Sequence, residues 1–203
     1  WSSDVCSSDL KHFPGHGSTN KDSHWNLPEI NKCIEELENE DIVPFKNAIE
    51  NNAEAIMIGH LKVNAMDKKF PASLSKKIIQ GYLQKELNYK GLIITDDLKM
   101  RAICLKYGFA GAAVKACKAG NDIIMIGVQY HFVKRAIKKI EKKIKAGTID
   151  EIDINNRVQK ILKIKEKYNV NDEIASGCDI NKINEDIILL NEKIDKSEKI
   201  KEL

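Results

Sequence analysis

The segment from Lys11 to Pro28, KHFPGHGSTNKDSHWNLP, gathers side chains that can exchange protons. Its Pro and Gly residues exclude a helix or a regular strand, which predicts a loop. In an extended stretch alternate residues point the same way, so the carboxylate of Asp22 can reach the imidazole of His24. A carboxylate at one ring nitrogen fixes the histidine tautomer and leaves the other nitrogen free to give or take a proton. The DSH triplet therefore suggests a general acid/base.

The same segment has two other interpretations. A metal site is one of them, because His12 and His16 are four residues apart. Pro14 and Gly15 break any helix between them, however, so the one-face geometry of an HExxH zinc site is lost. A surface loop without function is the other interpretation.

A second group of reactive side chains lies in ITDDLKM, where Asp96 and Asp97 end the apolar run GLIITDD. Carboxylates at this point are candidates for acid, base or nucleophile chemistry. They also suit the start of a following helix, whose dipole favours acidic residues in the first turn. The pair alone does not choose between these roles.

Short apolar runs predict three buried strands, over residues 53–60, 91–97 and 121–127. Helical spacing of apolar residues predicts helices over residues 28–52 (one helix or a pair), 74–87 (capped by Ser73 or Ser75), 109–120, 129–146 and 150–168. Continuous apolar strands followed by helices indicate a parallel α/β sheet. His60 and Asp96 come directly after strands, which is typical of a TIM (β/α)8 barrel, although open doubly wound sheets share this feature. With three strands recognised, the chain is interpreted as the latter half of such a barrel.

The composition excludes two classes of protein. Among the 203 residues 42% are hydrophobic and 31% are charged, and no window reaches the 18 or so apolar residues of a membrane span. The net charge of +3 comes from lysines spread along helical stretches, which predicts solvated helix faces and no nucleic-acid surface. The cysteines lack CxxC spacing, and Cys33, Cys104 and Cys117 are predicted to pack as small apolar side chains. This favours a reducing, cytoplasmic location and leaves a secreted or cell-wall location open.

The ends of the chain differ from its middle. Residues 1–10, WSSDVCSSDL, share none of the Lys, Ile and Asn bias of the rest and are interpreted as a foreign leader. Residues 11–170 are expected to form the partial barrel domain, and residues 171–203 a short helical and irregular tail.

Five motifs occur in the order KHFPGHG, DSH, MIGHLKV, PASLS and GLIITDDLKM. Together they resemble glycoside hydrolase family 3, and in particular its β-N-acetylglucosaminidase branch, whose bacterial members act on peptidoglycan fragments. The resemblance runs from Lys11 to about Val170 and covers the latter part of that family's barrel. It implies a retaining hydrolase that releases terminal β-linked N-acetylhexosamine from such glycans. It implies no cofactor and no metal, and a monomer when full length.

The resemblance also implies roles for individual residues. The catalytic residues are the nucleophile Asp96, the general acid/base His24 and its partner Asp22. The residues that bind substrate are Lys11, His12 and His60. In the implied double displacement, Asp96 attacks the anomeric carbon while His24 protonates the leaving oxygen.

Several alternatives stay open. The family also contains β-glucosidase-like enzymes, and phosphate could replace water as the acceptor. An inactive sugar-binding barrel piece and a metal hydrolase using His12, His16, His24 and Asp96 are the other candidates. A sheet of three or four strands leaves an open edge and an uncovered apolar face. We therefore expect the isolated 203-residue chain to be inactive and unstable.

Overall fold

The computed structural model describes residues 10–17, 27–170, 184–185 and 187–188. The chain divides into two compact units, Trp1–Ile164 and Lys165–Leu203. The sheets and the candidate site described below lie in the first unit. The described residues of the tail beyond Val170 are helical, and Ile187 and Ile188 among them are exposed.

The first unit is organised around a parallel sheet, as the apolar runs predict. Its strands are β1 (Leu10–Phe13), β3 (Ala55–Ile58) and β5 (Leu92–Thr95), in the order β1-β3-β5. Both pairings are parallel, with Ile58 opposite Thr95 at the carboxyl ends of β3 and β5. The fold class is therefore α/β with a parallel sheet. The described strands form an open sheet, and closure into a barrel is not seen among them.

The prediction of a loop throughout residues 11–28 is wrong at its start. Residues 11–13 belong to β1, because Leu10 and Phe13 pair with Ile56 and Ile58 of β3. The Pro and Gly residues that suggested a loop come only after Phe13, where the strand ends. Leu10, the last residue of the expected foreign leader, lies in the same strand.

The prediction of a strand over residues 121–127 is also wrong in extent. Only one parallel bridge forms, between Ile123 and Ile94 of β5. Beyond it, the Met125 carbonyl still accepts the Leu98 N–H at 3.0 Å, but side chains accept the N–H groups of Met125 and Gly127. The Met125 N–H donates to the Thr95 hydroxyl at 2.9 Å, and the Gly127 N–H donates to the Asp97 carboxylate at 2.9 Å. The segment therefore follows β5 without continuing the ladder.

A second small sheet pairs β2 (Glu29–Ile30) with β4 (Lys62–Val63), also in parallel. The Lys62 ammonium donates to the Glu29 carboxylate across this pair at 2.9 Å. The sequence did not predict these strands, because two residues are too short a run to show a period.

Most helices lie close to the ranges that the sequence predicts. Their bounds are α1 (Ile34–Asn39), α2 (Val43–Glu50), the 3₁₀ turn η1 (Ala72–Leu74), the π-type helix η2 (Lys77–Glu86), α3 (Arg101–Tyr107), α4 (Phe109–Ala119), α5 (Tyr130–Lys145) and α6 (Glu151–Lys167). The predicted helix over residues 28–52 is thus a pair, α1 and α2. Helix α3 was not predicted. Gly120 ends α4 in the left-handed conformation with φ of 114°, as expected for a residue after a helix.

One cysteine has a different role from the predicted one. Cys33 is exposed, and its sulfur accepts the N–H of Glu36 at the start of α1. The Glu36 carboxylate in turn accepts the Cys33 N–H at 2.8 Å, which completes a capping box. Cys117, in contrast, is buried as predicted.

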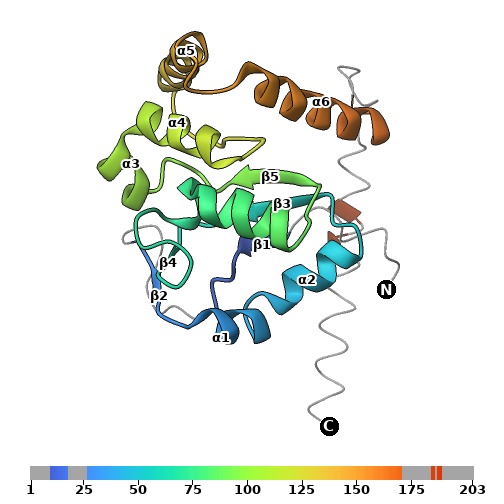
Figure 1. Ribbon diagram of the computed structural model, residues 1–203. Coiled ribbons are helices and arrows are strands. Elements are labelled where there is room, and N and C mark those ends of the chain that lie inside the picture. The colour runs from blue at the N-terminus through green and yellow to red at the C-terminus, as the bar shows by residue number, and fades with distance from the viewer. Residues whose placement is uncertain (1–9, 18–26, 171–183, 186, 189–203) are drawn as a thin grey trace. The chain divides into compact units, whose positions relative to one another are not determined.

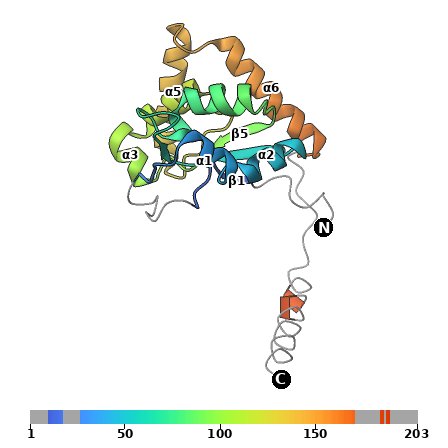
Figure 2. The same cartoon turned by 60° about the horizontal axis from the view of Figure 1, so that its bottom comes forward.

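The core lies between the sheet and the helices. Figures 1 and 2 both place α2 beside β1, where the rings of Phe13 and Phe45 meet edge to face with centroids 5.1 Å apart. Ile56, Ile58 and Ile93 of β3 and β5 are fully buried. This packing fixes the carboxyl ends of the strands, where the chemically active side chains emerge. None of the described helices is long and apolar enough to span a lipid bilayer.

Candidate active site

Three of the predicted site residues meet at the carboxyl-end edge of the β1-β3-β5 sheet. His12 comes from β1, His60 follows β3 by two residues, and Asp96 follows β5 directly. The Nε2 atom of His12 lies 3.7 Å from the Asp96 Oδ2 atom. Parallel strands bring these residues together because all their carboxyl ends lie on one edge.

The Asp96 carboxylate is held on one side and open on the other. Its Oδ1 atom accepts the N–H of Asp97 at 2.8 Å, and its own N–H donates to the Ile58 carbonyl at 3.0 Å. The side chain is 17% exposed, so solvent still reaches it. With Oδ1 engaged, Oδ2 is the oxygen that faces His12.

Asp97 has a structural part in this arrangement. Its Oδ1 atom accepts the N–H of Lys99 at 2.9 Å and the N–H of Gly127 at 2.9 Å. It thereby ties the turn after β5 to the segment that follows Ile123. This agrees with the interpretation of Asp97 as a supporting residue at the start of a turn or helix.

His60 is fully buried, and the structure gives both of its ring nitrogens a partner. Its Nδ1 atom lies 2.7 Å from the Ser73 hydroxyl, and its Nε2 atom lies 3.0 Å from the Asp97 carbonyl oxygen. Burial is the main influence on this imidazole and lowers its pKa, although the Asp97 carbonyl and the Asp96 and Asp97 carboxylates oppose it. His60 is therefore neutral near pH 7.

His12 is more open, with 31% of its side chain exposed. Burial lowers its pKa, the Asp96 carboxylate raises it, and the neighbouring His16 and Lys11 side chains lower it again. The net direction is downward, so near neutral pH His12 is a neutral imidazole beside an ionised carboxylate. A neutral imidazole has one N–H donor and one acceptor, which suits contact with a hydroxyl group.

Two glycines allow the close approach on which this edge depends. A Cβ added at Gly59 would lie 3.0 Å from the His12 Cβ atom. Gly15 has φ of +127°, and a Cβ there would lie 2.7 Å from the Asp41 Cβ atom. At both glycines a larger side chain would come too close to a neighbouring residue, His12 in one case and Asp41 in the other.

The structure places only some of the predicted site residues. Asp22 and His24 lie outside the described residues, so their predicted roles stay predictions. Lys11 lies in β1 next to His12 and is exposed. In the part of the chain that the structure describes, no three His, Cys, Asp or Glu side chains gather as a metal site.

The sequence missed the role of Ser73. Its hydroxyl meets His60, whereas the neighbouring Ser75 hydroxyl accepts the Ile78 N–H at 3.2 Å near the start of η2. Both serines were equal candidates for the helix cap, and spacing alone could not separate them. His60 and Ser73 are 13 positions apart, and the sequence between them carries no signal that they pair.

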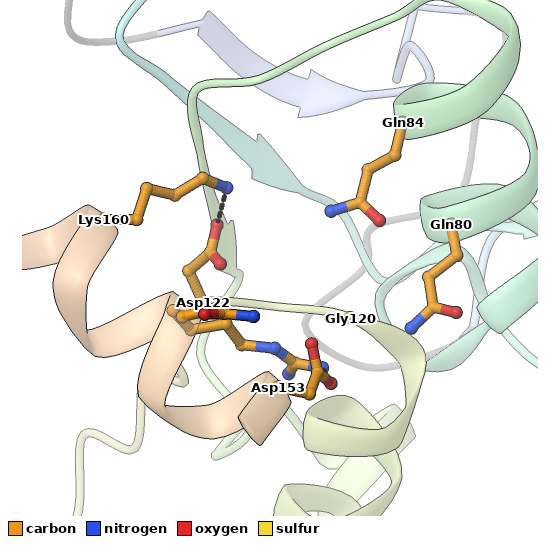
Figure 3. A pocket seen from close by; sticks show the side chains of 8 residues that line it. Gln80, Gln84, Gly120, Asp122, Asp153 and Lys160 are labelled. Atoms are coloured by element: carbon orange, nitrogen blue, oxygen red, sulfur yellow. Dashed lines mark hydrogen bonds and ion pairs between the residues drawn. The ribbon is translucent and has the colours of Figure 1, made fainter. Parts of the chain in front are cut away.

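A second polar pocket lies at the opposite, amino end of β5 (Figure 3). Asp122 accepts the Ile93 N–H at 2.8 Å there, and its carboxylate pairs with Lys160 of α6 at 2.7 Å. Gln80 and Gln84 of η2 line the other side of this cavity, whose volume is about 170 Å³. Arg157 donates to the carbonyls of Cys117 and Asn121 at 2.7 and 2.9 Å and also pairs with Asp153. These charges already satisfy one another, so the pocket is explained by the packing of α6.

Comparison with known proteins places the chain in a protein family. The sequence model described as the glycosyl hydrolase family 3 N terminal domain matches residues 3–164. The chain is 37% identical over 116 residues to a protein named Beta-hexosaminidase from Methylococcus capsulatus, over 57% of this chain and 34% of the relative. It is also 37% identical over 116 residues to the Beta-hexosaminidase of Neisseria gonorrhoeae, over 57% of this chain and 32% of the relative. The chain spans about a third of the length of these curated relatives.

Solved structures show the same similarity. The family 3 β-N-acetylglucosaminidase from a Paenibacillus species superposes with a TM-score of 0.80 at 36% identity, over 84% of this chain and 32% of that chain. The β-N-acetylglucosaminidase from Thermotoga maritima gives 0.68 at 27% identity, over 75% of this chain and 33% of that chain.

Proposed function

The chain belongs to glycosyl hydrolase family 3, and we propose that it carries the nucleophile of a retaining β-N-acetylhexosaminidase. The whole enzyme would release terminal β-linked N-acetylhexosamine from glycans such as peptidoglycan fragments. The observation that carries this proposal is the arrangement of the two oxygens of the Asp96 carboxylate. One carboxylate oxygen is held by a main-chain N–H, and the other faces a partly exposed edge beside His12.

The proposed reaction proceeds in two displacements. In the first, Asp96 Oδ2 forms a bond to the anomeric carbon as the glycosidic bond breaks, and His24 gives its proton to the leaving oxygen. In the second, His24 takes a proton from water, which attacks the anomeric carbon and releases Asp96 as a carboxylate. Asp22 orients His24 throughout.

The Asp97 N–H has a defined place in this chemistry. It stays on Oδ1 while Oδ2 reacts, and so it fixes the orientation of the carboxylate in both displacements. His12 offers a neutral imidazole, which binds a sugar hydroxyl without adding positive charge that would stabilise the Asp96 anion too strongly. Lys11 and His12 are proposed as the pair that contacts these hydroxyls.

We further propose that the sheet is the latter part of a (β/α)8 barrel. Its parallel order, with the reactive residues on the carboxyl-end edge, supports this arrangement. The names of the relatives support N-acetylhexosamine as the sugar that is released. A phosphorylase would form the same covalent intermediate and then transfer the sugar to phosphate. The product that is formed therefore shows whether water or phosphate is the acceptor.

The test is covalent labelling of the full-length gene product with a mechanism-based 2-acetamido-5-fluoro sugar, followed by peptide mass spectrometry. The label is expected on Asp96 and absent in Asp96→Asn. Glu141→Gln, an exposed substitution on α5 with the same change of charge, serves as the control and should label like the wild type. Label on another carboxylate, Asp97 included, would refute the assignment.

The acceptor is tested in the same preparation. With an aryl N-acetyl-β-glucosaminide as substrate, turnover in phosphate buffer is expected to give the free sugar. A sugar 1-phosphate as the main product would replace the hydrolase by a phosphorylase.

A further inference from the structure

A buried chain of hydrogen bonds runs toward Asp96 from the side opposite the solvent. The Asn121 amide donates to the Ser73 carbonyl at 2.9 Å, and the Ser73 hydroxyl contacts His60 Nδ1 at 2.7 Å. His60 Nε2 then meets the Asp97 carbonyl at 3.0 Å. Asn121, Ser73 and His60 are all at least 99% buried, so this chain is shielded from water.

The partners of His60 determine which tautomer it adopts. A carbonyl oxygen can only accept, so the Nε2 atom that faces Asp97 must carry the hydrogen. The neutral ring then has a lone pair on Nδ1, and the Ser73 hydroxyl must donate to it. Burial, which lowers the pKa of His60, favours this neutral state. The Asp97 carbonyl therefore selects the Nε2–H tautomer, and the Ser73 hydroxyl holds the ring in place by donating to Nδ1.

The Asp97 residue is held on each of its polar groups. His60 and the Met100 N–H hold its carbonyl, each at 3.0 Å, while Lys99 and Gly127 donate to its carboxylate. Its N–H is the group that holds Oδ1 of Asp96 at 2.8 Å. Fixing Asp97 therefore fixes the direction from which Asp96 is bound.

We propose that His60, held by Ser73 at Nδ1 and donating from Nε2 to the Asp97 carbonyl, is a positioning residue for the Asp96 nucleophile. This rests on the proposed function of Asp96. His60 acts through the Asp97 peptide and keeps Oδ1 engaged, so that Oδ2 faces the substrate. It is distinct from the substrate-binding role expected for His60, because both ring nitrogens are occupied by the protein.

The magnitude follows from how sensitive nucleophilic attack is to position. A displacement of about 1 Å can lower a rate about 100-fold. Removing the Ser73 hydroxyl leaves the buried Nδ1 atom of His60 without its partner, so that the ring is free to rotate away from the Asp97 carbonyl. We expect Ser73→Ala to lower kcat about 10- to 100-fold and to change KM by less than about threefold.

Ser75→Ala is the matched control. Ser75 is as fully buried as Ser73, lies two residues away, and donates at 2.6 Å to Asp67, which is outside this chain of hydrogen bonds. The two variants lose the same atom from equally buried sites. Ser75→Ala is expected to lower the free energy of unfolding like Ser73→Ala but to keep kcat.

The second pair of variants replaces His60 itself. In His60→Gln the side-chain amide can still donate toward the Asp97 carbonyl, whereas in His60→Leu that oxygen keeps only the Met100 N–H at 3.0 Å. Gln is expected to retain at least about tenfold more kcat than Leu.

All variants are assayed in the full-length gene product, for aryl glycoside turnover and for the rate of covalent labelling, at a temperature where circular dichroism shows them folded. A Ser73→Ala kcat equal to that of Ser75→Ala would overturn the proposal. If Ser73→Ala does not fold, equal kcat values for His60→Gln and His60→Leu would overturn it. A wild-type enzyme that carries no label on Asp96 would instead refute the proposed function itself.

Discussion

Replacing Gly127 by Ala tests how tightly the turn after β5 is built. Gly127 lies outside the left-handed region, so Ala is compatible with its backbone. The added Cβ, however, would lie 2.4 Å from the Asp97 Oδ2 atom, and ordinary contacts begin at 3.4 Å. The Asp97 carboxylate must therefore move by about 1 Å, since the main chain at Gly127 yields less readily than the end of a side chain.

The energetic consequence follows from the bonds that the carboxylate makes. It accepts two main-chain N–H groups, from Lys99 and from Gly127 itself, each at 2.9 Å. Hydrogen bonds to charged groups contribute about 1.5–3 kcal/mol each. Both N–H groups are exposed and can turn to water, so we expect Gly127→Ala to lower the free energy of unfolding by about 1–3 kcal/mol.

The same displacement should reach the catalytic residue, because Asp97 supplies the N–H that holds Asp96. We expect kcat to fall about 10- to 100-fold in the full-length protein. Stability is measured by urea denaturation and activity by aryl glycoside hydrolysis. Gly111→Ala is the control, because a Cβ there meets nothing within 4 Å and α4 should gain up to about 1 kcal/mol. A Gly127→Ala protein with the stability and activity of the wild type would show that Asp97 is not held as the structure describes.

Three further predictions concern stability. Ile58→Ala, at a fully buried position in β3, should lower the free energy of unfolding by about 2–5 kcal/mol in urea denaturation, and Ile58→Val by no more than about 1.5 kcal/mol. Lys160→Met should lower it by about 1–3 kcal/mol, because the Asp122 carboxylate, whose side chain is 3% exposed, loses its cation; a change below 0.5 kcal/mol would contradict this. His60 has its pKa lowered in the folded state, so the stability it contributes is present above about pH 6.5 and is lost as the pH falls through the folded-state pKa. His60→Gln should therefore show a smaller loss of stability between pH 7.5 and pH 5 than the wild type, and an equal loss would argue against a buried neutral imidazole.

The site was predictable where it depends on strand ends. Asp96 follows an apolar run that can only be a buried strand, and a parallel sheet places such residues on one edge. His60 could be assigned to the same edge by the same reasoning, since it follows the apolar run over residues 53–60. His12 could not, because the sequence placed it in a loop and its strand was not predicted.

The partners of these residues were not predictable, because they come from segments distant in sequence. His60 meets Ser73 and Asp97, which are 13 and 37 residues away, and Ser75 was an equal candidate for the role that the packing gives to Ser73. Hydrogen bonds between side chains leave no period in the sequence, since each needs only one residue at one place.

The same distinction applies to the fold. The amino-acid sequence determined the α/β class, the parallel direction and the position of Asp96, since apolar period and strand ends are local properties. The tertiary structure decided that residues 11–13 form an edge strand and that residues 121–127 make a single bridge. In both places the outcome depends on which strand partners and hydrogen-bond acceptors lie nearby in the folded chain. Phe13 pairs with Ile58, whereas the Thr95 and Asp97 side chains take the N–H groups of Met125 and Gly127 that a regular strand would have used.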